Sequence, residues 1–307
     1  MDTFIQLTID AVTLGSVYAL IALGYTLVYG VLKLLNFAHG DVFMVGTFIG
    51  YGVLQELGGS SSPKLSVWLI IPIITLAAMG GCALLGITIE RFAYRPLRDA
   101  PRIAPLISAL GVSFFLENSM QLLFGATPRN YNAFNFGNGY LYLKGFQIHG
   151  VTVPLLRIVT VVSAFVLMVA LWFLVNKTRT GKAMRATSFD REAAAMMGID
   201  IDRVIVFTFV LGSALAGAAG VIFALRVPTT VNIGFVIGLK GFIAAVIGGI
   251  GSIPGAMAGG LLLGFAESYV QGYISTQWSD LYVFSGLILL MIFRHQGLLG
   301  RPDIRKV

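Results

Sequence analysis

The sequence predicts an all-α integral membrane protein with about eight or nine membrane-spanning helices. Of its 307 residues, 57% are hydrophobic and only 11% are charged, whereas soluble globular domains carry about 25% charged residues. A water-soluble protein of this length has no core large enough to bury so much apolar surface. The apolar runs are also long, and about 20 apolar residues are needed for a helix to cross a bilayer. They do not alternate with polar residues, which excludes membrane-spanning strands.

Nine apolar segments are candidate membrane-spanning helices, and together they form a single transmembrane domain over residues 1–307. They are residues 9–32, 41–57, 67–89, 103–124, 152–175, 204–226, 236–251, 254–273 and 280–294. Segments 236–251 and 280–294 are short for a crossing, so some of these helices are expected to be short or broken. The run 248–260 is rich in glycine and contains Pro254, which predicts a bend or an interruption. Such a break either allows close packing at a turn or lines a pathway.

The positive charges predict the orientation of the chain. Fifteen of the 21 lysines and arginines are Lys33 or lie in residues 90–102, in residues 177–203 or after Phe293. With nine crossings these fifteen fall on one side, which the positive-inside rule assigns to the cytoplasm. The N-terminus is then outside and the C-terminus inside. The net charge of +7 therefore reflects topology and does not indicate nucleic-acid binding.

Two connecting segments are long enough to hold structure of their own. The outer one, about 125–151, is expected to form a short hairpin with its turn at Lys144 and Gly145, because apolar residues alternate on both sides. The inner one, about 177–203, is expected to be helical, and Gly198 suits the end of a helix there.

Several kinds of enzyme chemistry are absent from the sequence. It has no phosphate-binding loop, no His-Glu-x-x-His pair, no Gly-x-Ser-x-Gly elbow and only one cysteine, Cys82, which is expected to be a small buried residue. The N-terminus lacks the basic region of a cleaved signal peptide. We therefore expect a chain that is not an enzyme and that binds neither a metal nor a cofactor of its own.

Polar residues stand out in two places within the apolar segments. The stretch "NFAHGD" places Asn36, His39 and Asp41 between two spans. It either caps the second helix, where Asp41 suits a helix N-terminus and Asn36 satisfies open backbone groups, or it gates a translocation path. Gly40 is expected to supply a positive φ there.

Three further polar residues lie at membrane depth. They are Glu117 and Asn118 in the fourth span and Glu267 in the eighth. Because stranding an ionisable residue in lipid is costly, each is a candidate functional residue. They either line the translocation path or lock helices together.

Four stretches together resemble one family of transport proteins. Residues 192–198, "EAAAMMG", resemble the coupling loop of ABC importer permeases, although no Leu-Pro follows downstream. The stretches "GYTLVYGVLKLLNFAHGDVFMVG" (24–46), "ERFAYRPLR" (90–98), 182–198 and "GFIAAVIGGIGSIPGAMAGGLLLGFAE" (241–267) resemble the H-type permease subunit of branched-chain amino acid ABC transporters. Permeases for urea and short amides share the Asn-x-Ala-His-Gly core.

The resemblance implies a multi-pass permease subunit of the inner membrane that imports leucine, isoleucine and valine by alternating access. It implies a second homologous permease, two ATPase subunits that hold ATP and magnesium, and an extracytoplasmic solute-binding protein. The ATPases are expected to dock on Arg185, Glu192, Ala193, Ala194, Met197 and Gly198. A urea or short-amide permease, a gradient-driven carrier or channel, and a membrane scaffold without transport remain alternatives. Whether the second permease is a different chain or a second copy stays open.

Overall fold

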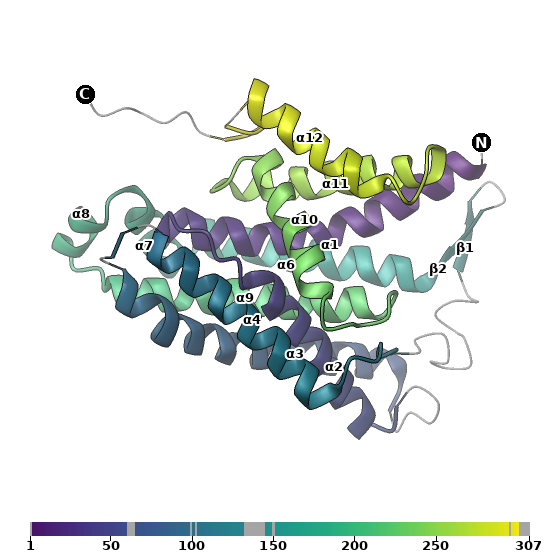
Figure 1. Ribbon diagram of the computed structural model, residues 1–307, viewed down its shortest axis with the longest axis horizontal. Helices are drawn as coiled ribbons and strands as arrows, with labels where there is room; N and C mark the ends of the chain where they lie inside the picture. Colours follow the sequence, from purple (N-terminus) through teal and green to yellow (C-terminus); the bar gives the residue numbers. More distant parts are fainter. Residues whose placement is uncertain are drawn as a thin grey trace.

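The computed structural model describes residues 2–59, 65–98, 100–101, 103–131, 145–148, 151–294 and 296–300. This part of the chain is a bundle of α-helices with one small two-stranded sheet at the end where the N-terminus lies (Figure 1). The predicted all-α membrane class is therefore confirmed.

Helix α1 (Asp2–Leu32) runs through the middle of the bundle (Figure 1). It contacts α11 (Ile253–Tyr273), α9 (Ile201–Ala224), α10 (Ile233–Gly248) and α6 (Leu155–Lys177). The crossing with α11 is close, because a Cβ atom added to Gly264 would lie 2.4 Å from the Cα atom of Gly15. Close backbone approach at small residues is how helices pack in lipid, where neighbouring lipid tails are as apolar as leucine.

Helices α2 (His39–Glu56), α3 (Val67–Ile89) and α4 (Ile103–Phe124) form the other side of the bundle, with α9 between them and α1 (Figure 1). Helix α3 continues into a π-helical turn, Glu90–Tyr94, and a 3-10 turn, Arg95–Leu97. Glycines of α9 again set the spacing: a Cβ atom on Gly220 would lie 2.5 Å from the carbonyl oxygen of Phe43.

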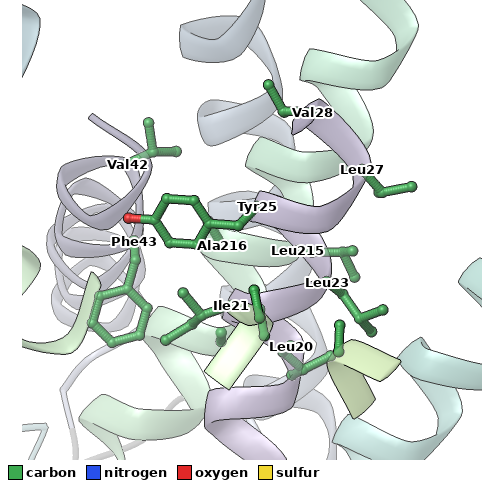
Figure 2. Packing of buried hydrophobic residues seen from close by; sticks show 14 of the residues in the cluster. Leu20, Ile21, Leu23, Tyr25, Leu27, Val28, Val42, Phe43, Leu215 and Ala216 are labelled. Atoms are coloured by element: carbon green, nitrogen blue, oxygen red, sulfur yellow. The ribbon is translucent and has the colours of Figure 1, made fainter. Parts of the chain in front are cut away.

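The main hydrophobic core lies where α1, α2, α9 and α10 meet. Figure 2 shows the side chain of Tyr25 reaching from α1 toward Val42 and Phe43 of α2. In contrast, α3, α4 and α6 turn large apolar side chains outward, among them Leu84, Leu122 and Phe165. Outward apolar side chains suit a surface in contact with lipid or with another membrane subunit.

Among the described residues, five helical segments are long and apolar enough to cross a membrane by themselves. They are Asp2–Leu32, Val67–Leu97, Ile103–Phe124, Leu155–Lys177 and Ile201–Ala224. A sixth arises if α10 and α11 count as one broken span. Helix α2 and the shorter α12 (Ser279–Phe293) cover two further segments that the sequence predicts as spans. The number of eight or nine crossings, and their orientation, stay predictions.

The glycine-rich break is where the sequence places it. Helices α10 and α11 are bent by 119° relative to each other. Gly249 and Gly251 take positive φ values of 104° and 92°, and Pro254 begins α11. The Ser252 side chain accepts a hydrogen bond from the backbone N–H of Gly255 at 3.2 Å, which caps the new helix.

The predicted hairpin has a different turn from the one that the sequence suggests. Strand β1 (Gly145–Ile148) pairs antiparallel with β2 (Val151–Pro154), with Ile148 opposite Val151. The turn at Lys144 and Gly145 is therefore wrong, and the apolar residues 140–143 expected to pair lie outside the described residues. In β2, Val151 and Val153 are buried and Thr152 is exposed, so burial of one face selects this pairing.

Candidate functional site

The turn between α1 and α2 begins with an unusual backbone conformation. Lys33, directly after the last residue of α1, has a φ of 57°. The carbonyl groups at this end of α1 accept hydrogen bonds from Arg191, whose Nη2 atom lies 2.7 Å from the oxygen of Leu32 and 3.2 Å from that of Val31. The last carbonyls of a helix lack partners within it, so a cationic side chain there stabilises the end of the helix.

Asn36 joins this turn to the end of α3. Its Oδ1 atom accepts a hydrogen bond from the hydroxyl group of Tyr94 at 3.0 Å, and both side chains are buried. Tyr94 belongs to the π-helical turn that extends α3. The side chain of Asn36 therefore fixes the turn against a neighbouring helix, 58 residues further along the chain.

His39 fills the space between the first two helices. Its ring meets the ring of Tyr25 edge-on, with 4.7 Å between centroids. A Cβ atom on Gly24 would lie 2.1 Å from Nε2 of His39, so only glycine allows this contact. Among the described residues, no group hydrogen-bonds to Nε2.

Gly40 has a different role from the one that the sequence suggests. It lies in the first turn of α2 and is absent from the residues with positive φ, so the expected left-handed conformation is wrong. The left-handed residue of this turn is Lys33. Gly40 is required by close packing, because an added Cβ atom would lie 2.3 Å from the carbonyl oxygen of Gly234 and 2.8 Å from the Cα atom of Gly238 in α10.

Asp41 lies in the first turn of α2, as expected, and is buried. Its Oδ2 atom accepts a hydrogen bond from the hydroxyl group of Ser113 in α4 at 2.5 Å. Glu117, one turn further along α4, is half-buried. Asn118 is exposed, and its side chain donates to the carbonyl oxygen of Phe114 in its own helix at 2.7 Å. Asp41 thus links two helices, whereas Asn118 bonds within one.

Glu267 belongs to a second polar cluster, between α10, α11 and α12. Its Oε1 atom lies 2.7 Å from Nζ of Lys240, and the two residues are 3% and 6% exposed. Gln271 donates to the same oxygen at 3.0 Å, and the hydroxyl group of Tyr18 donates to Oε2 at 2.8 Å. Lys240 also lies 2.8 Å from Oδ1 of Asp280. An ion pair this deep in an apolar protein is a candidate functional site.

Lys240 is the residue that sequence reasoning missed. It is the only charged residue of α10, whose sequence is "IGFVIGLKGFIAAVIG". A lone lysine in an apolar helix is a signal in itself, because its charge needs a partner in the bilayer. Lys240 is one of the six lysines and arginines outside the fifteen that were assigned to the cytoplasm, and as a topology signal alone it did not stand out.

The cluster borders a cavity of about 420 Å³ between α1, α9, α10 and α11. A second group of charges lies on its wall. Asp10 of α1 lies 2.9 Å from Arg157 and 3.5 Å from Arg226, which follows α9. The remaining lining is largely apolar and includes Val17, Phe223 and Ile237.

The residues predicted to contact an ATPase, from Arg185 to Gly198, lie in a segment that forms two short helices. This docking segment is at the opposite end of the bundle from the N-terminus (Figure 1). Each helix has a side-chain cap: Thr178 accepts from Gly181 N–H before α7 (Arg179–Phe189), and Asp190 accepts from Ala193 N–H before α8 (Arg191–Met196). Gly198, with a φ of 81°, follows the end of α8 as expected. These caps stabilise the first turns of the two short helices.

The segment exposes large apolar side chains at its tip. Phe189, Met196 and Met197 are 85%, 82% and 83% exposed. Of the residues predicted to couple to an ATPase, five are exposed and one is buried. The exposed ones are Arg185, Glu192, Ala193, Met197 and Gly198, and Ala194 faces the bundle with 4% exposure. The guanidinium group of Arg185 donates to the carbonyl oxygen of Val175, near the end of α6.

The geometry defines a class of protein before any comparison is made. A multi-pass helical bundle with a buried ion pair beside a cavity, and with short helices that expose apolar side chains at one end, is typical of a membrane transport protein. Within the described part of the chain, no three His, Cys, Asp or Glu side chains gather in a way that would hold a metal ion.

Comparison with known proteins gives the family. Residues 7–293 match the family described as the branched-chain amino acid transport system / permease component, and the chain belongs to it. The chain is 40% identical to the high-affinity branched-chain amino acid transport system permease protein LivH of Salmonella typhimurium, over 99% of this chain and 98% of that protein. It is 39% identical to the permease protein BraD of Pseudomonas aeruginosa, with the same coverage.

A more distant relative is a second kind of permease. The chain is 25% identical to the permease protein LivM of Escherichia coli, over 97% of this chain and 72% of that protein. No solved structure matches the chain. The family and the apolar helices make the chain a multi-pass protein of the inner membrane.

Proposed function

We propose that this chain is the membrane-spanning subunit of an ATP-driven importer of branched-chain amino acids. The family and the names of the relatives support the substrate class. The observation that carries the ATP-driven mechanism is the helix pair α7–α8, which exposes Phe189, Met196 and Met197 to solvent. A short helix with flexible methionine side chains suits a groove on a partner protein. The proposed partner is an ATPase, with one copy for each of two permease subunits.

Arg191 connects this docking segment to the helix bundle. It lies at the start of α8 and hydrogen-bonds the last carbonyl groups of α1. A displacement of α8 by the ATPase therefore acts on the end of α1 and on the turn that follows. That turn is bonded through Asn36 to the end of α3 and through Asp41 to α4. We accordingly propose that the residues Asn36, His39 and Asp41 transmit the gating motion between helices.

Transport then follows alternating access. ATP binding and release on the partner ATPases, which hold ATP and magnesium, move α7 and α8. The bundle changes between a state open to the outside and one open to the inside. The amino acid biases this equilibrium only as far as it binds the two states differently.

Two further partners belong to the proposal. A solute-binding protein delivers the amino acid on the side of the N-terminus, which we place outside the cell. A second permease completes the channel, and the similarity to LivM supports a homologous chain in that place. The outward apolar faces of α3, α4 and α6 offer surface for this subunit as well as for lipid.

Uptake into vesicles tests the proposal. The chain is reconstituted with a second permease, ATPase and binding protein from the same operon, and labelled leucine and labelled urea are supplied separately. We expect leucine to accumulate only when ATP is present on the ATPase side. Accumulation of urea instead of leucine, or leucine uptake that follows an ion gradient without ATP, would contradict the proposal.

A charge reversal at Glu192 tests ATPase docking in a chain that still folds and inserts. Glu192 is exposed on α8, and Glu192→Lys reverses its charge without changing a buried contact. We expect this variant to insert normally and to retain less ATPase in a pull-down. Asp2→Lys is the control, because Asp2 is also an exposed acidic residue but lies near the N-terminus, at the opposite end of the bundle (Figure 1). Equal retention of the ATPase by wild type and Glu192→Lys would remove Glu192 from the docking surface.

A further inference from the structure

The cavity beside Lys240 and Glu267 carries charge of both signs on separate parts of its wall. On one part, Lys240 is shared between two carboxylates, Glu267 at 2.7 Å and Asp280 at 2.8 Å, so this group carries one net negative charge. On the other, the carboxylate of Asp10 is shared between Arg157 and Arg226 at 2.9 and 3.5 Å, so that group carries one net positive charge. Asp10, Arg226, Lys240 and Glu267 all line the cavity.

The remaining wall is apolar, with Val17 from α1, Phe223 from α9 and Ile237 from α10 among its residues. The volume of about 420 Å³ falls within the range of about 300–1,000 Å³ that is usual for small-molecule sites. Such sites combine apolar walls with a few polar groups that fix the orientation of the ligand. Charge of both signs beside an apolar wall matches a molecule that carries an ammonium group, a carboxylate and an apolar side chain.

We propose that this cavity is a binding site for a zwitterionic amino acid with an apolar side chain on its way through the protein. The inference rests on the proposed function and deepens it by naming the site within the membrane subunit. The carboxylate of the amino acid lies toward Arg226, and its ammonium group lies toward Glu267. The side chain lies against the apolar wall. The two charged groups on the wall orient the amino acid. They select against molecules that carry only an ammonium group or only a carboxylate.

The cavity and the docking segment contact opposite ends of α1, so this helix connects the two. Residues 10 and 32 of this helix are about 33 Å apart at 1.5 Å per residue. Tyr18, about a third of the way along this stretch, donates a hydrogen bond to Glu267 at 2.8 Å, and Arg191 bonds the far end of the same helix. A shift of α1 that begins at α8 therefore changes the wall of the cavity.

Protection from chemical labelling tests occupancy without relying on transport. Val227 lines the cavity and is 38% exposed, whereas Val236 is 45% exposed and lies outside the lining. Each is replaced by cysteine in a Cys82→Ala background, in the assembled complex without its binding protein. At four times the dissociation constant, bound leucine should slow maleimide labelling of Val227→Cys about fivefold and leave Val236→Cys unchanged.

Two analogues test the charges. Leucinamide lacks the carboxylate and 4-methylpentanoate lacks the ammonium group, so neither should protect Val227→Cys at the same concentration. Equal protection by either analogue would overturn the zwitterion site, because one charge would then suffice. Unchanged labelling with leucine, or equal slowing at Val227→Cys and Val236→Cys, would overturn it too, since the second result reports a general closure.

Filling the cavity gives a second readout. Ile237→Trp extends into the cavity, and Val236→Trp is the matched control on the adjacent, outward position. We expect Ile237→Trp to lower leucine uptake per assembled complex by about tenfold or more, equivalent to roughly 1.4 kcal/mol. Uptake equal to that of Val236→Trp would overturn the inference.

The two proposals fail in different ways. If the wild-type complex imports leucine with ATP but leucine does not protect Val227→Cys, the cavity is not the site and the importer stands. If leucine protects Val227→Cys but no ATP-dependent uptake occurs, the site stands and the proposed importer does not.

Discussion

The turn before α2 and the cluster around Lys240 both bury polar groups among apolar helices, but their surroundings differ. In the turn, Asn36 and Asp41 each bond a side chain of another helix, and His39 packs against Gly24 and Tyr25. None of the three lines the cavity of about 420 Å³, whereas Lys240 and Glu267 do. The most conspicuous polar motif of the sequence therefore joins helices, and a lone lysine borders the cavity that we propose as a ligand site.

The largest expected loss of stability is at the cluster of Lys240, Glu267 and Asp280. Lys240→Met leaves Glu267 and Asp280 without their cation, and removing one partner of a buried pair costs about 3–5 kcal/mol. The thermal unfolding midpoint of the purified protein should fall clearly. Adding Glu267→Gln to Lys240→Met should recover part of the loss, because it removes an uncompensated charge. A midpoint unchanged by Lys240→Met would show that the ion pair does not hold α10 and α11 together.

A smaller effect is expected at the contact of the turn with α10. Gly40→Ala pushes a methyl group into the backbone of Gly234, where the Cβ atom would lie 2.3 Å from an oxygen. Overpacking of this kind costs about 1–3 kcal/mol. Gly52→Ala is the matched control in the same helix, since its Cβ atom meets nothing within 4 Å. Thermal unfolding should show Gly40→Ala destabilised relative to Gly52→Ala, and equal midpoints would contradict the close contact.

The smallest effect is expected for the hydrogen bond that fixes the turn. Asn36→Ala and Tyr94→Phe each remove one partner of the same bond, so the double variant should lose less stability than the sum of the two. The coupling should be about 0.5–1.5 kcal/mol, the usual net value of a hydrogen bond. Tyr131→Phe, whose hydroxyl group bonds the carbonyl oxygen of Thr47 instead, serves as the control. If the stability losses of Asn36→Ala and Tyr94→Phe are fully additive in the double variant, the two side chains are not hydrogen-bonded to each other.

Local sequence signals predicted much of the fold. Each of the nine predicted segments corresponds largely to one helix, because hydrophobicity and length are properties of the segment itself. Two of the predicted bounds are wrong: residues 152–154 belong to strand β2, and residues 249–251 form the break after α10. The break before Pro254 and the helix end at Gly198 follow from the backbone preferences of proline and glycine. These are the features for which a few neighbouring residues suffice.

Contacts between distant segments explain what the sequence did not predict. The sequence suggests that Gly40 is a flexible turn residue, and only the structure shows that it packs against Gly234. The sequence likewise gives no partner for Asn36, which bonds Tyr94 in the structure. The strand at 145–148 has two possible partners in the sequence, and burial of Val151 and Val153 selects one. Lys240 was detectable as a lone charge in an apolar helix, but its position beside a cavity requires the packing of α1 and α11.

We propose that motion of the docking segment reaches the helix bundle through Arg191, which hydrogen-bonds the end of α1. The most direct measurement is the ratio of leucine imported to ATP hydrolysed, in the same vesicles, for wild type and Arg191→Gln. Arg203→Gln is the control, since that side chain is 88% exposed and pairs with Asp200 close to it in the chain. We predict that Arg191→Gln keeps the ATPase bound and hydrolysing but imports much less leucine per ATP, whereas Arg203→Gln matches wild type. An unchanged ratio in Arg191→Gln would contradict the account.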